Sequence, residues 1–574
     1  MRVAFVVFVP VAAAIVAFWW WLGSPVAPAT AEFGHGEKLY CVSYSPFRNN
    51  ETPLDLTTRV DPREIDDDLA RLSRITDCVR TYSTDFGLDH VAEIAARHGM
   101  KVIQGAWIGF DKVRNRREID TVTALSRQFP DTIRAVVVGN EVLLRGELSP
   151  TDLAALIRGA KAQLSVPVTY ADVWEFWLRY REVYDAVDFV TIHVLPYWED
   201  FPVSAGAAAA HLEEIYRKVA TAFPAKEILV GEVGWPSAGR MREGALPSPA
   251  NQARVAEDVL ALARRQNFHV NLIEAFDQPW KRQLEGTVGG HWGLLDGATR
   301  EPKFALGVAV SDHPFWRLQA AGGVAFAAAV FAAAVASRRR APLARFQAER
   351  RPVGRPESAP DLKLRAHSDA KPGSTFAGCA LTNERLAARW AGVAAIALAS
   401  GMLVGWAIEN APLESLGVGG WARSLMTAAL AAIAPVAGAA ALMRRIAVPA
   451  MAEVLGRAAD RPTDQLALGL GLVFAVLCVM ALESALGLVF DPRYRDFPFA
   501  PLSAAAMPFL VLSLVGARPD GRRGLAETVM AAAFALSALY VAFNESFANW
   551  QSLWLCAVFL GIGLTLFRAR DARS

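Results

Sequence analysis

Apolar stretches of about 20 residues near both ends of this chain constrain its fold more than any other feature. The first runs from residue 3 to 22, directly after Met1 and Arg2, and the others follow residue 318. A helix of about 20 apolar residues spans the roughly 30 Å of hydrocarbon in a bilayer. Residues 36–315 read as a soluble region, although apolar residues make up 53% of the 574-residue chain. The sequence therefore predicts a soluble domain between membrane-spanning segments.

The first apolar stretch has two interpretations. Small residues such as Ala29 and Ala31 would suit a peptidase that removes a signal peptide. We favour an uncleaved anchor over residues 1–30, because the stretch is long enough to cross a bilayer. It also closes with three consecutive tryptophans that begin at Trp19, which is typical of the interface between lipid and water.

Seven further spans are expected in the second half of the chain. They lie at about 318–337, 389–408, 424–442, 466–490, 502–516, 526–543 and 551–567. The last six form a transmembrane domain at 389–567, which a tail at 568–574 follows. Residues 338–388 are rich in Arg, Pro, Ser and Ala, and we expect a basic cytoplasmic linker that is at least partly disordered.

The arginines predict the orientation in the membrane. With eight crossings, these fall on one side: Arg338, Arg339, Arg340, Arg444, Arg445, Arg518, Arg522, Arg523, Arg568, Arg570 and Arg573. The positive-inside rule puts such loops in the cytoplasm. Arg493 and Arg495 are exceptions, and acidic residues flank them. We expect a multi-pass membrane protein, with both termini cytoplasmic and the soluble domain outside the cytoplasm.

Several other chemistries find little support in the sequence. The nine histidines lack the short helical spacing of a zinc site, so we expect no metal and no cofactor. The basic linker is expected to lie along anionic lipid, and nucleic acid is not an expected partner. Cys41 and Cys78 fall on neighbouring candidate strands. They either pair in an oxidising compartment or pack as buried thiols, and both alternatives stay open.

Between residues 38 and 310, short apolar runs alternate with helical stretches, a pattern typical of parallel strands joined by crossover helices. The candidate strands are 39–44, 77–82, 101–107, 134–140, 167–171, 188–193, 227–232 and 270–276. Eight such units predict an α/β fold, a closed (β/α)8 TIM barrel, followed by an all-α multi-span membrane domain.

Two glutamates stand at strand tips, Glu141 after the fourth strand and Glu232 at the end of the seventh. Such a residue is often only a salt-bridge partner or a helix N-terminal charge. These two, however, lie 91 positions apart. That is three barrel units of roughly 30 residues, which puts them across the mouth from one another. Facing carboxyl groups about 5 to 5.5 Å apart are the catalytic pair of a retaining glycosidase.

The residues beside the glutamates favour the same interpretation. Asn140 offers an amide to a sugar hydroxyl, and Gly231 lets the backbone pack closely where a substrate approaches. Arg80 or Tyr82 near Glu232 would lower the pKa of its carboxyl group, while a neighbouring anion and burial would raise the pKa of Glu141. The spacing alone does not fix which glutamate is the acid.

Further polar and aromatic side chains fall at the same strand ends. The candidates for sugar contact are Tyr44, Arg80, Tyr82, Asn140, His193, Tyr197, Trp235, Glu274, Asp277, Trp280 and Lys281. Aromatic rings stack on the apolar faces of sugars, and polar groups pair with the hydroxyls. A single ring at such a position is more often core filling, so the gathering of several is what favours a binding site.

Motifs in chain order resemble glycoside hydrolase family 17. They are YSPFR (44–48), VRTYS (79–83), GAWIG (105–109), VVVGNEVLLR (136–145), HVLPYW (193–198), ILVGEVGWPS (228–237), NQAR (251–254) and EAFDQPWK (274–281). The chain is similar in particular to bacterial, membrane-anchored β-glucan transglycosylases of cyclic β-glucan synthesis. The resemblance implies a retaining β-1,3-glucan-active barrel with Glu141 as acid/base and Glu232 as nucleophile. It also implies that the sugar-contact candidates other than Arg80 and His193 line the substrate cleft.

We therefore expect a transglycosidase that elongates, branches (β-1,6 linkages being one version) or cyclises β-glucan in the periplasm. A barrel tethered on both sides suits the editing of a polymer as it leaves the membrane. A β-1,3-glucan hydrolase, exo or endo, needs the same glutamates and is one alternative, and a non-catalytic glucan-binding or transport component is another. The expected partners are β-glucan, the lipid bilayer and a membrane glucan synthase.

Overall fold

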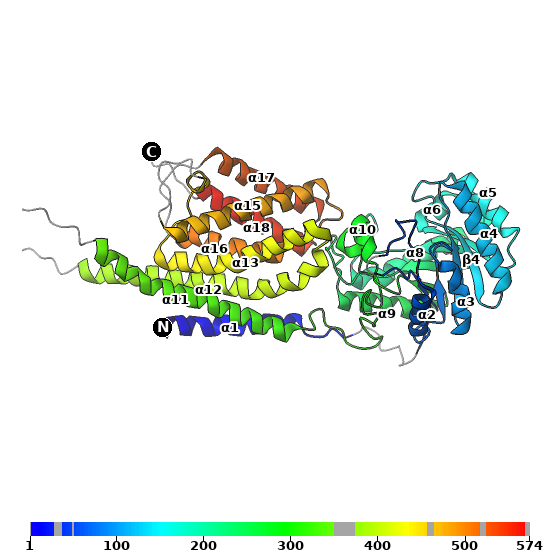
Figure 1. Ribbon diagram of the computed structural model, residues 1–574, viewed down its shortest axis with the longest axis horizontal. Coiled ribbons are helices and arrows are strands. Elements are labelled where there is room, and N and C mark those ends of the chain that lie inside the picture. The colour runs from blue at the N-terminus through cyan, green and yellow to red at the C-terminus, as the bar shows by residue number, and fades with distance from the viewer. Residues whose placement is uncertain are drawn as a thin grey trace, which may run out of the picture.

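The computed structural model describes residues 2–27, 37–48, 51–348, 374–455, 464–516 and 524–568. Figure 1 shows two parts along the long axis, a barrel with its surrounding helices and a bundle of long helices. Helix α1 (Arg2–Leu22) lies in the bundle, although it precedes the barrel in the chain. The chain therefore starts in the bundle, builds the barrel and then returns.

Eight parallel strands close the barrel. They are β1 (Cys41–Ser43), β2 (Cys78–Arg80), β3 (Lys101–Ala106), β4 (Ile133–Asn140), β5 (Val168–Val173), β6 (Val190–His193), β7 (Ile228–Val233) and β8 (His269–Leu272). Each strand pairs with the next in chain order, and β8 pairs with β1 where Asn271 faces Cys41. The predicted (β/α)8 barrel is thus confirmed.

The last strand shows the largest difference from its predicted end. The interpretation of 270–276 as a strand is correct only as far as Leu272, because the next residues turn to another partner. The amide of Glu274 donates to the carbonyl of Trp292 at 3.1 Å, and Phe276 bridges Leu295. Glu274 therefore lies in the segment that follows β8 and not in the strand itself.

Helices cover the outside of the barrel. They are α2 (Pro62–Leu72), α3 (Val91–Arg97), α4 (Lys112–Gln128), α5 (Pro150–Lys161), α6 (Trp174–Arg179), α7 (Arg181–Ala186), α8 (Ala208–Ala222), α9 (Pro249–Gln266) and α10 (Arg282–Gly289). Helices α2, α5 and α9 begin with proline after Asp61, Ser149 and Ser248, whose side chains accept from backbone N–H groups of the first turn. A capping side chain followed by proline is a strong start signal, since proline lacks the N–H that would be left unpaired.

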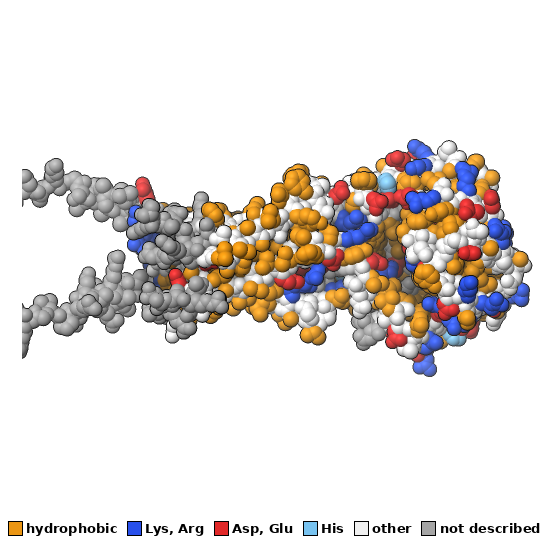
Figure 2. Space-filling view, turned by 90° about the horizontal axis from the view of Figure 1, so that it is seen from above, with side chains coloured by type: hydrophobic (Ala, Val, Ile, Leu, Met, Phe, Trp, Pro, Cys, Tyr) orange, Lys and Arg blue, Asp and Glu red, His pale blue; other side chains and the backbone are white. Residues whose placement is uncertain are grey.

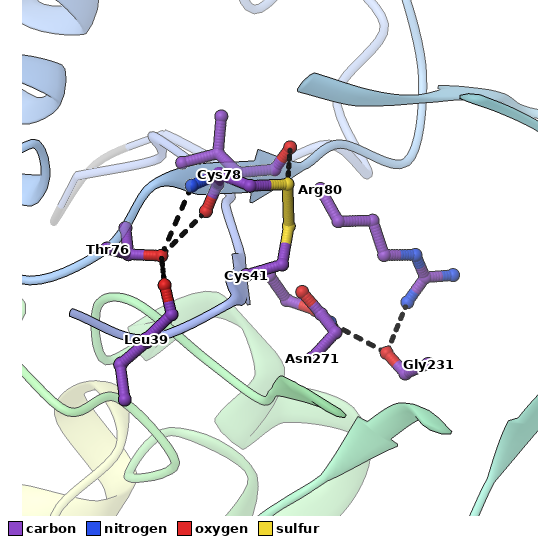
Figure 3. The surroundings of a disulfide bond; sticks show 9 residues. Leu39, Cys41, Thr76, Cys78, Arg80, Gly231 and Asn271 are labelled. Atoms are coloured by element: carbon purple, nitrogen blue, oxygen red, sulfur yellow. Dashed lines mark hydrogen bonds between the residues drawn. A yellow bond between two sulfur atoms is a disulfide. The ribbon is translucent and has the colours of Figure 1, made fainter. Parts of the chain in front are cut away.

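The barrel interior holds a small cluster from six strands. Its members are Cys41, Cys78, Ile103, Ala135, Val137, Ala171 and Leu229. Within it, Cys41 and Cys78 form a disulfide bond between β1 and β2, so the structure shows pairing and not two free thiols. Figure 3 shows Arg80 beside this bond, and its guanidinium reaches the carbonyl oxygen of Gly231 at 3.4 Å. The disulfide therefore fixes the strand that carries Arg80.

The bundle contains a helix for each predicted span. After α1 come α11 (Trp316–Ala348), α12 (Ser374–Glu414), α13 (Gly417–Arg444), the short α14 (Met451–Val454), α15 (Gln465–Phe490), α16 (Phe499–Val515), α17 (Leu525–Asn544) and α18 (Trp550–Arg568). In the described part of the chain, seven are long and apolar enough to cross a membrane, and α16 is a shorter apolar helix. Figure 2 shows hydrophobic side chains over much of the bundle, while charged side chains gather on the barrel.

The predicted linker is shorter than expected. Helix α11 continues to Ala348 and α12 begins at Ser374, so both ends of the 338–388 segment are helical. Alanine, leucine and arginine are strong helix formers, and they are frequent in these two stretches. The remaining residues 349–373 lie outside the described ranges. The same holds for other residues used in the sequence analysis: Ala29, Ala31, Arg518, Arg522, Arg523, Arg570 and Arg573.

Three connections between bundle helices meet the barrel. Arg282 in α10 donates to the carbonyl of Ser415 at 3.0 Å, Arg240 forms an ion pair with Glu545, and Asn549 donates to the carbonyl of Met241 at 3.0 Å. Arg240 also donates to carbonyls of the 491–498 connection. The barrel-facing connections are thus 413–416, 491–498 and 545–549. Because the long helices alternate in direction, Arg444 at the end of α13 lies at the opposite end of the bundle.

Candidate active site

The two predicted glutamates meet at the carboxyl ends of the strands. Glu141 follows β4 directly, and Glu232 is the penultimate residue of β7. One side-chain oxygen of each, together with a ring nitrogen of His193, all lie within 4.8 Å of one another. This spacing agrees with the roughly 5 to 5.5 Å between carboxyl groups of retaining glycosidases, and is shorter than the 6.5 Å or more of inverting ones.

The backbone at Glu141 is itself unusual. Its φ is +53°, in the left-handed region that residues other than glycine rarely adopt. Such a conformation costs on the order of 1–3 kcal/mol and persists where the surroundings determine it, often at functional sites. The amide of Glu141 donates to the carbonyl of Ala171 at 2.7 Å, which holds the residue against β5.

Glu232 is held as an anion. Its Oε1 accepts from Arg80 Nη1 at 2.6 Å and from the Tyr82 hydroxyl at 2.9 Å. Burial by itself would raise the pKa of Glu232, but the charges of His193 and Arg80 and the two hydrogen bonds outweigh it and lower the pKa. Arg80 and Tyr82 therefore lower the pKa of Glu232, as the sequence predicts.

Asn140 contributes to the same network. Its Oδ1 accepts from the Nη2 of Arg80, so the amide oxygen positions the arginine. No described residue bonds its Nδ2, which leaves that nitrogen for a ligand. Arg80 is therefore fixed from both sides, by Asn140 on β4 and by the Gly231 carbonyl on β7.

His193 stands between the two glutamates. Its Nδ1 lies 2.7 Å from Glu141 Oε1, its Nε2 lies 3.6 Å from Glu232 Oε1, and the side chain is fully buried. Gly231 makes room for this arrangement, because a Cβ there would overlap the Cγ2 of Thr191 and approach the imidazole to 3.4 Å. Space for protein side chains, and not only for a substrate, therefore explains this glycine.

Two acids near the pair were absent from the sugar-contact candidates. Burial raises the pKa of Asp172 on β5 to about 6, and the charge of Glu141 adds to the shift. The pKa of Glu285 in α10 is also raised, mainly by burial, and the nearby charges of Glu141 and Glu232 add to the shift. The sequence does place Asp172 among the polar residues at strand tips, although not among the sugar-contact candidates. Glu285 lies on a helix beyond the last strand, and no strand-tip pattern points to it.

Glu274 and Lys281 form a buried pair beside the glutamates. Lys281 Nζ lies 2.8 Å from Glu274 Oε1. Burial raises the pKa of Glu274 to about 7, although the lysine opposes the shift. The Oε2 of Glu274 is buried and has no hydrogen-bond partner among the described residues. An unpaired buried oxygen is costly, so it is a natural acceptor for a ligand hydroxyl.

The structure places the other predicted contacts differently. Tyr44, Tyr197 and Trp235 are almost fully buried, and their polar atoms are bonded to Asp68, the Arg240 carbonyl and the Leu246 carbonyl. They have no surface for a sugar and instead support the wall below the mouth. Strand-tip position does not reveal which side of the wall a ring fills, which is why the sequence grouped them with the contacts.

Of the two remaining predicted contacts, Asp277 is buried and Trp280 is partly exposed. Asp277 is buried and accepts from Lys303 Nζ at 2.8 Å and from the Gly293 amide at 2.9 Å, so it braces the loop after β8. Trp280 is partly exposed, and its indole N–H donates to Gln278 at 2.8 Å. Its ring is therefore fixed in orientation with part of its surface open.

Glu141, His193 and Glu232 are also the described residues with the spacing to hold a metal ion. Glu232 Oε1, however, already accepts from Arg80 and Tyr82, and Glu141 Oε1 already bonds His193. A cation would have to replace these contacts next to a guanidinium group. The donor set therefore fits proton transfer and nucleophilic attack better than metal binding.

Comparisons with known proteins find similarities over the barrel. The family model described as BtgE/BtgC glycoside hydrolase domain matches residues 41–293, from the first residue of β1 to just beyond α10. A relative from Neosartorya fischeri, "Probable beta-glucosidase btgE", is 29% identical over 38% of this chain and 40% of its own length. "Glucan 1,3-beta-glucosidase" of Candida albicans is 27% identical over 40% of this chain and 81% of its own length.

Among solved structures, the crystal structure of a glycoside hydrolase family 17 β-1,3-glucanosyltransferase from Rhizomucor miehei is similar, with 27% identity and a TM-score of 0.40. The match covers 46% of this chain and 98% of that chain. Residues 41–293 thus match a glycoside hydrolase domain, and a glucosidase is among the curated relatives. These relatives are fungal, so the resemblance to bacterial cyclic-glucan enzymes stays a prediction.

Proposed function

We propose that the barrel is a retaining β-1,3-glucan transglycosidase, with Glu232 as nucleophile and Glu141 as acid/base. The observation that carries the proposal is the pair itself, with oxygens within 4.8 Å and unequal surroundings. Glu232 is buried and bonded by Arg80 and Tyr82, which keeps it anionic. Glu141 is more exposed, with 23% of its side chain accessible, and it contacts His193.

The reaction follows from these positions in two steps. Glu232 attacks the anomeric carbon while Glu141 gives its proton to the departing glycosidic oxygen, which leaves a covalent glycosyl-enzyme. Glu141 then takes a proton from an incoming hydroxyl, whose oxygen displaces Glu232 and restores the original configuration. If that hydroxyl belongs to another glucan, the product is a longer, branched or cyclic chain, with a β-1,6 bond as one product.

Placement favours transfer over hydrolysis. The mouth of the barrel lies beside the barrel-facing loops of the bundle, since α10 both approaches the glutamates and contacts residues 413–416. The arginine distribution supports a bundle in a bacterial inner membrane, with the barrel in the periplasm and both termini in the cytoplasm. A glucan synthase in the same membrane is a candidate supplier of the donor chain.

Product length tests the proposal directly. The full-length protein in detergent is incubated with a single β-1,3-glucan oligosaccharide, and the products are separated by size. Products longer than the donor support transfer, and NMR of their linkages identifies the bond formed. Shorter products alone would identify a hydrolase, because water is then the acceptor.

A variant pair separates catalysis from binding alone. Glu232→Ala and Glu141→Ala are expected to lower turnover by several orders of magnitude, because each removes a group that changes its bonds in the reaction. Retention of wild-type turnover by either variant would support a non-catalytic glucan-binding or transport component instead.

A further inference from the structure

The loop 491–498 of the bundle reaches the barrel beside the candidate active site. Its residue Tyr494 lies edge-on to Trp198, which follows β6, with ring centroids 6.1 Å apart. The Trp198 ring also stacks on Trp292, with centroids 6.5 Å apart and an interplanar angle of 14°. Two parts of the chain almost 300 positions apart thus build one aromatic surface.

Two arginines converge on this surface. The guanidinium carbon of Arg242 lies 5.4 Å from the Trp198 ring centroid, and that of Arg493 lies 5.7 Å from it. Neither arginine has an ion-pair partner among the described residues. Burial lowers the pKa of Arg242, and the nearby charge of Arg493 lowers it further. Arg242 Nη1 donates to the Tyr197 carbonyl at 2.7 Å, and the other guanidinium N–H groups of the two arginines have no bond to a described residue, so they can donate to a ligand.

The surface is open to solvent, unlike a sealed packing contact. Trp198, Tyr494 and Arg242 are partly exposed, and Arg493 is exposed. Buried packing between the two parts is found elsewhere, at the ion pair of Arg240 with Glu545, where the two side chains are 3% and 8% exposed. Docking of the barrel therefore does not require the Trp198 surface.

Helix α10 connects this surface to the catalytic pair. The charges of Glu141 and Glu232 contribute to the raised pKa of Glu285 in this helix. The next residue, Gly286, packs so closely against Tyr494 that a Cβ would overlap the Tyr494 carbonyl. A chain that leaves the glutamates past Glu285 would therefore meet Tyr494 and Trp198 next.

We propose that Trp198, Arg242, Arg493 and Tyr494 form a binding site for a β-glucan chain, shared between the barrel and the bundle. Aromatic rings bind the apolar faces of sugars, and the arginines donate to their hydroxyls. An anionic lipid headgroup fits less well, because it has no apolar face to stack on the Trp198 and Tyr494 rings. The inference rests on the proposed function and adds that the membrane part contributes to substrate binding.

The dependence of activity on chain length tests the shared site. Full-length protein in nanodiscs of zwitterionic lipid is assayed on β-1,3-glucan oligosaccharides of two to ten units, and kcat/KM is compared between long and short substrates. Tyr494→Ala and Arg493→Ala are each expected to lower the ratio of long to short about tenfold. Arg495→Ala is the matched control, because Arg495 lies in the same loop but pairs with Glu483 and Asp491, and its ratio should equal that of wild type.

Several outcomes would overturn the inference. One is an unchanged ratio of long to short in Tyr494→Ala and Arg493→Ala proteins that melt like wild type. Another is an equal loss in Arg495→Ala. If Tyr494→Ala fails to fold, Tyr494→Leu takes its place. An effect of Arg493→Ala that appears only in nanodiscs with anionic lipid would identify a headgroup site instead. Failure of the proposed function is distinguishable, because Glu232→Ala would then keep its turnover on the shortest substrate.

Discussion

At the scale of single residues, the difference between Glu141 and Glu232 arises from their neighbours. Both are glutamates at strand ends, but only Glu232 accepts from Arg80 and Tyr82. The sequence could predict that the two face one another, since strand order fixes that. It could not predict that Asn140 holds Arg80 or that His193 bridges the pair, because these contacts depend on side-chain directions within the closed barrel.

Arg80 is expected to set the acidic limit of activity. The lowered pKa of Glu232 keeps the nucleophile ionised below the 4.5 of a free glutamate, and the anion is lost only as the pH falls through that lowered value. Removal of the guanidinium in Arg80→Met leaves burial unopposed by it, so the pKa rises. The acidic limb of the kcat/KM profile should then move to higher pH, with kcat lowered about 100-fold or more. A variant profile that overlays the wild-type profile would contradict this role.

At the scale of elements, the barrel strands were predictable and their tips only in part. Short apolar runs that alternate with helical stretches identified all eight strands, because buried parallel strands are largely apolar. The end of β8 was missed, since residues 273–276 pair with a later segment that has no strand pattern. Tyr44, Tyr197 and Trp235 were assigned to the sugar for a similar reason, as periodicity does not show which rings the loops cover.

The disulfide bond between β1 and β2 is expected to stabilise the barrel. It closes a loop with a sequence separation of 37, and a loop of that size corresponds to about 4 kcal/mol of chain entropy. The double variant Cys41→Ser/Cys78→Ser should therefore melt at a lower temperature than wild type in thermal unfolding of the full-length protein. Reductant should lower the wild-type melting temperature and leave that of the double variant unchanged. Equal melting of the two proteins without reductant would contradict the role of the bond.

At the scale of the whole molecule, the barrel is fixed to the bundle at its functional end. On the barrel side, the residues in contact are Arg240 and Met241, which follow β7, and Arg282, which follows β8. Their partners in the bundle are Glu545, Asn549 and Ser415. The hydrophobic pattern of the sequence predicted all the described bundle helices except the short α14, because about 20 apolar residues are needed to span a bilayer. It could not predict the docking, which depends on a few polar residues in short loops.

Two arginine–glutamate pairs allow a controlled test of that docking. Breaking the buried pair with Glu545→Gln should cost about 3–5 kcal/mol, because Arg240 is then left buried without its counter-charge. Glu483→Gln, which breaks the exposed contacts with Arg423 and Arg495, should cost less than about 1 kcal/mol. Thermal unfolding in detergent and protease sensitivity of the junction measure the difference. Equal effects of the two variants would argue against a fixed barrel.

The covalent intermediate tests the central claim most directly. A 2-deoxy-2-fluoro glucosyl donor slows the second step of a retaining enzyme, so the sugar should accumulate on its nucleophile. Mass spectrometry of protease fragments from the treated full-length protein should find one added sugar on the peptide that contains Glu232. A label on Glu141, or turnover that inverts the anomeric configuration without any covalent adduct, would contradict the account.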